Sequence, residues 1–334
     1  MTLPYSLLDL APILEGVPIQ QSYRNMVDLA QRAEAWGFTR YWLAEHHAHP
    51  GVASAAPVVL IGQVLAHTKT MRVGAGGVML PNHAPLVVAE QFGTLEAMFP
   101  GRVDLGLGRA PGTDQRTAAA LRRNMGGGAD SFPQDVMELL HYFGPAPEVP
   151  EGMVYVRAVP GEGLGVPLYI LGSSLYGAEL AALLGLPFAF ASHFAPEHLI
   201  PAMALYRSKY RPSAANPKPY AIATVNVVAA DDRARAEYLF TSLQLHFLNI
   251  GRGHPQPLEL PVDDITQHAS PADLTHLRSK LGGTIVGDRE DMAKGLAEFR
   301  VRSGADELLL TALIHDHEAR CRSFQIAAEV IKTT

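Results

Sequence analysis

Cys321 is the only cysteine in this 334-residue chain, so no disulfide can form within it. Lysine and arginine are scattered and the net charge is −6, which leaves no basic stripe for nucleic acid or an anionic membrane. The longest apolar run, around "PVVLIG", is far too short to cross a bilayer, and no basic region precedes an apolar run as in a signal peptide. These absences predict a soluble cytoplasmic protein with no membrane or nucleic-acid partner.

Short apolar runs alternate with helical patterns along the chain. Between the runs, amphipathic stretches predict helices, among them one over 54–67 with Ser54 as its cap. Strict alternation predicts parallel strands with right-handed crossovers, and eight units predict a (β/α)8 TIM barrel, with residues 1–334 as a single domain. A doubly wound open sheet is the alternative, but no glycine-rich fingerprint follows the first strand. The eight expected strands are 5–10, 40–44, 71–80, 102–108, 166–171, 187–192, 220–230 and 307–313.

Two stretches break the alternation. Residues 249–283 are rich in proline, glycine and histidine and are too long for a simple connector. We predict an irregular insertion there, before the last strand, and we consider it a candidate lid over the active site. The other stretch, 144–165, is a Pro/Gly-rich excursion that follows one or two helices over 114–143.

The loops that follow the strands of a (β/α)8 barrel build its active site. In this chain those loops are polar and rich in glycine and histidine. The segments are "EHHAH" after the second strand, "GAGG" at the end of the third, "GRAPGTD" after the fourth, "GSS" after the fifth and His193 after the sixth. Their convergence on one rim is stronger evidence for a site than any one motif.

Three of these segments have a ligand-binding interpretation beside a plain structural one. Arg109 is either a surface arginine or part of a rigid anion-binding loop, because guanidinium binds phosphate through two hydrogen bonds. Ser173 and Ser174 are either a helix cap or, with free N–H groups and the helix dipole, a phosphate site. Gly76 and Gly77 either mark a bulge or leave backbone that a flat aromatic ligand can approach closely.

The histidines also have more than one interpretation. His46 and His47 could be one buried and one solvated residue of a polar loop. A metal could instead be bound by His46, His47 and His49 together with a second cluster formed by His315 and His317. No partner cluster has the i, i+4 helical spacing of a zinc enzyme, and the two clusters lie on loops that need not meet. We therefore predict no metal site.

The chain resembles the bacterial luciferase-like monooxygenases, a flavin-dependent (β/α)8 family, and is most like the large bacterial subgroup whose substrates are mostly unassigned. The resemblance covers most of the chain outside 249–283. It rests on several linked motifs in order: "YWLAEHHAHPGVASAAPVVLIG", "MRVGAGGVMLPNHAPLVVAEQFGTLEAMFPGRVDLGLGRAPGTD", "LGSSLYGAELAALLGLPFAFASHFAP" and "TIVGDREDMAKGLAEFRVRSGADELLLTALIHDHEAR".

The resemblance implies roles for individual residues. His46 corresponds to the family's catalytic histidine beside the flavin. Gly76-Gly77 corresponds to a small-residue pair whose peptide is cis and against which the isoalloxazine packs. Arg109 corresponds to the arginine that binds the FMN phosphate, and Ser173 to a serine that binds the same phosphate.

Two further residues, Ser174 and His193, join the expected cofactor-binding set because they follow strands on the same rim. The chain also departs from luciferase itself. Gly172, Tyr176 and Gly108 stand where luciferase has a glutamate, a threonine and its reactive cysteine. These departures put the aldehyde chemistry and light emission of luciferase in doubt, and they leave the flavin site in place.

The resemblance implies an FMN-dependent monooxygenase that uses O2 and a small organic substrate, with reduced FMN supplied by a separate flavin reductase, and it implies a homodimer. Three alternatives remain. An F420-dependent oxidoreductase of the same fold would transfer hydride without oxygen. A non-catalytic flavin-binding protein would keep the ligand and lose the reaction. A metal-dependent barrel hydrolase would use the histidine clusters.

Overall fold

The computed structural model describes residues 3–121, 130–148 and 154–333. Nine parallel strands pair within this part of the chain, in the order β6-β5-β4-β3-β2-β1-β9-β7-β8, and β6 also pairs with β7. That pairing closes eight strands into the predicted TIM barrel and leaves β8 outside it. The strands are β1 (Tyr5–Asp9), β2 (Arg40–Leu43), β3 (Arg72–Met79), β4 (Val103–Gly108), β5 (Leu168–Gly172), β6 (Phe188–Phe190), β7 (Ala221–Ala229), β8 (Ile285–Gly287) and β9 (Glu307–Thr311).

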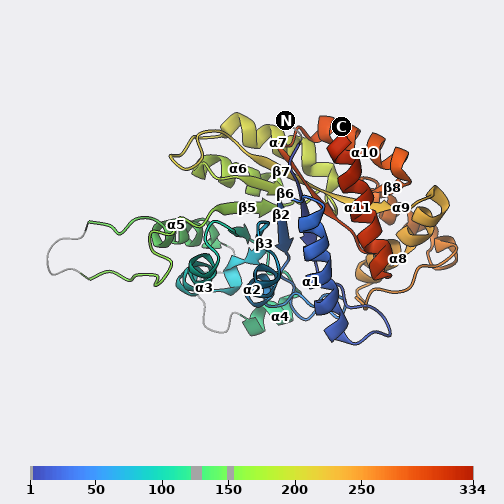
Figure 1. Ribbon diagram of the computed structural model, residues 1–334, viewed down its shortest axis with the longest axis horizontal. Helices are drawn as coiled ribbons and strands as arrows, with labels where there is room; N and C mark the ends of the chain where they lie inside the picture. The colour runs from blue at the N-terminus through green and yellow to red at the C-terminus, as the bar shows by residue number, and fades with distance from the viewer. Residues whose placement is uncertain (1–2, 122–129, 149–153, 334) are drawn as a thin grey trace.

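Helices surround the barrel, with α1 beside α11, so the first and last helices are neighbours (Figure 1). None of the described helices is long and apolar enough to cross a membrane. The helices are α1 (Ile19–Ala35), α2 (Pro57–His67), η1 (Leu80–Asn82), α3 (Pro85–Met98), α4 (Gln115–Leu121), α5 (Phe132–Phe143), α6 (Leu175–Leu184), η3 (Pro196–His198), α7 (Leu199–Lys209), α8 (Arg233–Gly251), η4 (Ile265–Gln267), α9 (Pro271–Leu281), α10 (Arg289–Ser303) and α11 (His317–Thr333).

Proline and glycine mark many of the helix ends. Pro57, Pro85 and Pro271 are the first residues of their helices, where the missing N–H costs no hydrogen bond. Gly185 and Gly304 follow α6 and α10 with φ of 63° and 58°, a left-handed conformation that closes the last turn and favours glycine.

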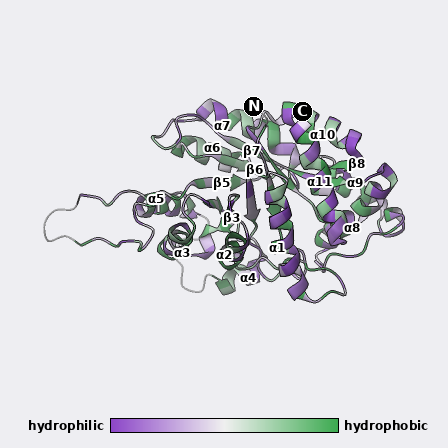
Figure 2. Ribbon diagram, in the orientation of Figure 1, coloured by the Kyte–Doolittle hydropathy of each residue, from purple (hydrophilic) through white to green (hydrophobic). Residues whose placement is uncertain are grey.

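The main hydrophobic core lies between the barrel and its helices, and a smaller cluster that includes Leu8, Trp42 and Ile222 fills the barrel interior. Hydrophilic residues mark much of the visible length of α1 in Figure 2, as expected for a helix that packs only one face on the core. The strands are buried on both sides, which explains why most of their residues are apolar in the sequence.

A buried ion-pair network lies where the strands begin. Arg40, the first residue of β2, pairs with Asp104 and with Glu307, the first residue of β9, at 2.8 Å each. The hydroxyl of Tyr220 donates a further hydrogen bond to Glu307 at 2.6 Å. All these groups lie at the amino-terminal end of the barrel, so the opposite, carboxyl-terminal end carries the loops expected to form the site.

The prediction of an irregular insertion over 249–283 is wrong in part. The helix α8 continues to Gly251, η4 follows, and α9 occupies 271–281. A capping box explains α9, because Ser270 and Asp273 each bond the backbone N–H of the other. The strand β8 was also missed, since it is three residues long and pairs only with the end of β7.

The segment between α8 and α9 packs against the carboxyl-terminal rim of the barrel. Leu258 forms a parallel bridge with Leu14 and donates its N–H to the carbonyl of Ile13 at 2.8 Å. A Cβ added to Gly51 would lie 2.4 Å from the carbonyl oxygen of Gln256. This segment therefore lies directly on the loops that follow β1 and β2.

Candidate functional site

The expected site residues all follow, or end, strands at one end of the barrel. His46 follows β2, the pair Gly76-Gly77 lies in the second half of β3, and Arg109 follows β4. Two serines and a histidine complete the set after β5 and β6: Ser173, Ser174 and His193.

A buried carboxylate supports the loop after β2. Glu45 is 0% exposed, and its Oε1 accepts hydrogen bonds from Nε2 of His47 at 2.7 Å and Nε2 of His83 at 2.8 Å. Its Oε2 accepts a bond from the backbone N–H of Met79 at 3.0 Å. Burial alone would raise the pKa of Glu45, but the hydrogen bond and charge of His83, with the hydrogen bonds from His47 and the Met79 N–H, lower it on balance. Glu45 is therefore an ionised anchor for this loop.

The loop position of His46 is determined by Ser54. The N–H of His46 donates to the carbonyl of Ser54 at 3.1 Å, and the Ser54 hydroxyl donates to the carbonyl of Ala44. The prediction of Ser54 as a helix cap is thus wrong, because Ala56 caps α2. Burial lowers the pKa of His46, opposed by a backbone hydrogen bond at Gly112, so the imidazole is neutral at pH 7.

Three more histidines surround His46. Its ring centroid lies 6.3 Å from that of His49, which lies 5.7 Å from that of His246 on α8. Burial, followed by the repulsion of neighbouring histidines, lowers the pKa of His246 to about 4 and that of His193 to about 3. These rings are therefore neutral at pH 7, and each can both donate and accept a hydrogen bond.

One atom of this group lacks a partner. The Nδ1 atom of His193 is buried and makes no hydrogen bond within the described part of the chain. Asn226, on β7, holds the backbone of the same residue by donating to its carbonyl at 2.6 Å. A buried ring nitrogen without a hydrogen bond costs folding free energy unless a ligand supplies the missing partner. The atom is therefore a candidate contact to a bound cofactor or substrate.

The glycine pair lies where strand pairing is irregular. A cis peptide bond joins Gly76 to Gly77, and the register of β3 against β4 shifts between Ala75 and Val78. A Cβ on Gly77 would lie 2.7 Å from the carbonyl oxygen of Gly106, so no side chain fits there. Gly76 is partly exposed, which leaves its backbone accessible to a flat ligand.

The cation of the site is held by an aromatic ring. The Arg109 guanidinium carbon lies 4.0 Å from the centroid of the Tyr176 ring, in the first turn of α6. Ser174 is the N-cap of α6, and its side chain makes no capping bond. Among the described residues, Arg109 forms no ion pair with a carboxylate. A free guanidinium, free hydroxyls and a helix N-terminus thus lie together.

The metal alternative finds little support at the rim. The side chain of His317 points to Asp28 on α1, with Nε2 2.7 Å from Oδ2. Nε2 of His315 lies 3.4 Å from the carbonyl oxygen of Glu15. No group of potential metal ligands in the described ranges combines histidines from the two loops. The candidate group at the rim is Glu45, His47 and His83, whose ligand atoms lie within 4.8 Å of one another.

Sequence reasoning missed several parts of this site. His246 lies within a helical pattern that gives no signal of its approach to His49. Tyr176 was noted only as a departure from luciferase, although it supports Arg109. Glu45 stands in the same "EHHAH" motif as His46, and a carboxylate beside two histidines was a readable signal for a hydrogen-bonded anchor.

Known proteins resemble this chain along its length. A family model described as luciferase-like monooxygenase matches residues 8–307. A protein of Escherichia coli (strain K12), named a luciferase-like monooxygenase, is 51% identical over 329 residues, which cover 98% of this chain and 97% of the relative. The crystal structure of apo-MsnO8 is 31% identical, covers 99% of both chains and has a TM-score of 0.86.

Two more distant structures share the fold at 17% identity each. One is the oxygenating constituent of 3,6-diketocamphane monooxygenase from the CAM plasmid of Pseudomonas putida in complex with FMN, with a TM-score of 0.69 and coverage of 100% of this chain and 99% of that chain. The other is an F420-dependent secondary alcohol dehydrogenase, with a TM-score of 0.72 and 99% of both chains covered. The fold therefore accommodates either cofactor.

The barrel, its rim and these relatives define the class of protein, which is an oxidoreductase that incorporates oxygen into its substrate. The chain belongs to the luciferase-like monooxygenase family.

Proposed function

We propose that this protein is a monooxygenase that binds reduced FMN and uses O2 to oxygenate a small organic substrate. The observation that carries the proposal is the Arg109 guanidinium, which lies over Tyr176 at the N-terminus of α6 and is paired with no carboxylate of the described residues. Such an exposed and oriented guanidinium is available to bind an anion. A phosphate monoester at the end of a flavin side chain is an anion of suitable geometry.

The phosphate end would be held by Arg109, Ser173 and Ser174. Arg109 offers a fixed fork of N–H donors, and the ring of Tyr176 limits the orientations of the fork, which reduces the entropy lost on binding. Ser174 offers a hydroxyl that no capping bond occupies. The N-terminus of α6 adds the favourable field of its dipole.

The ring end would be held by the glycine pair and the neutral histidines. Gly76 presents backbone rather than a side chain, so a planar ring can lie against it. The unpaired Nδ1 of His193 is a candidate hydrogen-bond partner for a polar edge of that ring. Bound reduced FMN supplies the electrons that activate O2 for transfer of one oxygen atom to the substrate.

His46 is the proposed catalytic residue. Its pKa is lowered by burial, so the imidazole carries no charge at pH 7 and can accept a proton at its free ring nitrogen during the reaction. Residues 252–264, between α8 and α9, rest on the loops after β1 and β2 and are the proposed lid that excludes water.

The test is to mix the protein with photoreduced FMN, add oxygenated buffer and follow the flavin spectrum. We expect reoxidation to be slower than for free FMN, because a shielded site restricts decay. An His46→Ala variant should bind FMN and lose substrate oxygenation. Equal activity in that variant would show that His46 is not the catalytic residue. A parent protein that binds FMN and gives no oxygenation would favour a non-catalytic flavin-binding protein. Tight binding of F420 with no affinity for FMN would instead favour an F420-dependent oxidoreductase.

The proposal includes two partners. A separate flavin reductase would supply reduced FMN, and a second copy of the chain would complete a homodimer in the cytoplasm. Coupled assays with and without a reductase test the first expectation, since FMN and a nicotinamide alone should give no turnover. Light scattering tests the second, and a monomeric mass at micromolar concentration would contradict it.

A further inference from the structure

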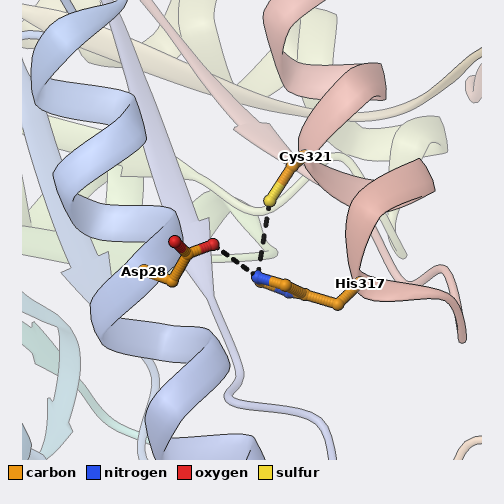
Figure 3. Close-up of side chains that lie close together, drawn as sticks. All are labelled: Asp28, His317 and Cys321. Atoms are coloured by element: carbon orange, nitrogen blue, oxygen red, sulfur yellow. Dashed lines mark hydrogen bonds and ion pairs between the residues drawn. The ribbon is translucent and has the colours of Figure 1, made fainter.

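A second cluster of chemically active side chains lies on the outer wall of the barrel, between the first and last helices. Asp28 comes from α1, whereas His317 and Cys321 come from α11, and the three side chains point toward one another (Figure 3). Within the described part of the chain, no hydrogen bond or ion pair links them to the rim residues of the flavin site. The proposed flavin chemistry therefore makes no use of this cluster.

The donor atoms of the cluster converge on one point. Nε2 of His317 lies 2.7 Å from Oδ2 of Asp28 and 3.6 Å from Sγ of Cys321. All three atoms lie within 4.8 Å of one another. Nitrogen, oxygen and sulfur ligands at such distances are the donor set that zinc accepts in proteins.

The spacing on α11 is that of a chelating helix. His317 and Cys321 are four residues apart, so both side chains lie on the same helix face, one turn from each other. The spacing joins a histidine to a cysteine, so it does not occur within the histidine clusters of the sequence. The sequence could not predict that Asp28 lies beside these two residues, since Asp28 is 289 residues away from His317.

The arrangement does not suit a nucleophilic triad. In such a relay the two ring nitrogens of histidine face different partners, one the nucleophile and the other the carboxylate. Here the same atom, Nε2 of His317, faces both Asp28 and Cys321. Burial also raises the pKa of the Cys321 thiol to about 11, so the unassisted sulfur is a poor nucleophile at neutral pH.

The distances suit a tetrahedral ion after a small adjustment. In a tetrahedral zinc site the donor atoms lie roughly 3.4–3.6 Å apart, as follows from metal–ligand bonds of about 2.0–2.3 Å. The nitrogen–sulfur distance of 3.6 Å already has this value. The nitrogen–oxygen distance of 2.7 Å must widen by about 0.7 Å, and the side chain of Asp28, which is 42% exposed, has room to rotate.

The charges around the cluster also balance. Arg32 donates to Asp28 at 2.9 Å and is itself paired with Glu318 through two hydrogen bonds of 2.8 Å. Because Glu318 neutralises Arg32, the carboxylate of Asp28 and a thiolate of Cys321 would together offset the two charges of a divalent ion. The loaded cluster would then be neutral.

We propose that Asp28, His317 and Cys321 form a zinc site, with water as the fourth ligand, that ties the first helix to the last. When zinc binds, the thiol of Cys321 gives up its proton to solvent and the thiolate binds the ion. His317 binds through Nε2 as a neutral imidazole, with its one ring proton on Nδ1. The site is independent of flavin. It acts on the stability of the barrel wall, where the two ends of the chain meet.

The test is a zinc titration of the full-length protein after dialysis against a chelator, followed by competition with a chromogenic zinc indicator. We expect one zinc per chain. Cobalt substituted for zinc should give the near-ultraviolet charge-transfer absorption of a thiolate ligand. Cys321→Ser should abolish that absorption, and Asp28→Asn, at a partly exposed position, should weaken zinc binding at least tenfold.

The matched control is His83→Gln, which removes a histidine from the other candidate group, Glu45, His47 and His83, and leaves the α1–α11 cluster intact. Zinc affinity within twofold of the parent is expected for this control. The proposal fails if the parent binds no zinc at micromolar free metal. It also fails if both variants of the α1–α11 cluster bind normally, or if His83→Gln is the change that removes the ion. Thermal unfolding without zinc shows that each variant is folded.

Discussion

The guanidinium carbon of Arg109 lies 4.0 Å from the centroid of the Tyr176 ring, although the two residues follow different strands of the barrel. A cation held over an aromatic ring gains roughly 0.5–1 kcal/mol at an exposed position. The contact thus orients the arginine before any anion arrives. Loss of the Tyr176 ring alone should therefore weaken anion binding only a few-fold, whereas loss of the arginine removes the binding group itself.

We expect Arg109→Ala to weaken FMN binding on the order of 30- to 150-fold, because the loss of a hydrogen bond to a charged group costs about 2–3 kcal/mol. Fluorescence titration of FMN measures the effect. The matched control is Arg116→Ala, since Arg116 is an exposed arginine in the first turn of α4. Equal affinity in the Arg109 variant and the parent would show that the phosphate lies elsewhere.

The buried histidines predict a loss of stability in acid. His246 has its pKa lowered to about 4 in the folded state, whereas an unfolded histidine titrates near 6.5, so the unfolded state binds more protons between these values. Stability from this residue is complete above pH 6.5 and is lost as the pH falls toward 4. Between pH 7 and 5 the loss amounts to about 2 kcal/mol.

An His246→Gln variant should lose correspondingly less stability than the parent between pH 7 and pH 5. Urea unfolding at the two pH values measures the difference, with His67→Gln as the control because His67 is exposed on α2. If the parent and the His246 variant lose the same free energy, His246 is not buried in its neutral form.

The ion pairs at the amino-terminal end of the barrel predict a change in stability without a change in flavin affinity. Arg40→Leu leaves the buried carboxylates of Asp104 and Glu307 without their central partner, which should cost about 3–5 kcal/mol. Denaturant unfolding and FMN titration of the folded fraction are the two measurements. Arg300→Leu, at an exposed position on α10, should stay within about 0.5 kcal/mol of the parent.

The contact between Gly51 and the proposed lid can be tested by one methyl group. In Gly51→Ala the new Cβ would meet the carbonyl oxygen of Gln256 at 2.4 Å, so the segment must move away from the rim. We expect faster hydrogen exchange over residues 252–260 and several-fold faster reoxidation of bound reduced FMN.

Gly283→Ala is the control for that experiment, because its Cβ would make an ordinary contact of 3.6 Å with Pro196. The lid interpretation loses its support if Gly51→Ala changes hydrogen exchange but leaves the rate of flavin reoxidation at the parent value.

The eight barrel strands could be predicted from the sequence because burial on both faces makes most of their residues apolar or glycine, apart from charged residues such as Arg40 and Glu307 near their first positions. The strand β8 could not be predicted, because Ile285–Gly287 has only two apolar residues before a glycine and is defined by its pairing with β7. The helix α9 was missed although the capping pair Ser270 and Asp273 is local and readable. The prolines and glycines nearby led to a prediction of irregular structure in spite of that capping pair.

Site residues that stand next to strand ends could be placed on one rim from sequence, since the barrel determines where each strand ends. Contacts between different helices and strands could not be predicted in this way. The approach of His246 to His49 depends on how α8 packs across the rim, and the stacking of Arg109 on Tyr176 depends on the twist between neighbouring strands. Neither contact can be predicted from the spacing of residues in the sequence.

The pairing of β7 has a mechanical consequence for the segment that covers the rim. One strand holds both ends of the larger segment that runs from α8 to β8. The helix α8 begins at Arg233, four residues after β7 ends at Ala229, and β7 pairs with β8 through Val227, Val228 and Ala229. A chain of about fifty residues thus starts and finishes at adjacent points of the barrel. Both ends of this segment are fixed at one edge of the barrel. The segment can therefore open only by rotation about that edge, and its two ends cannot move apart.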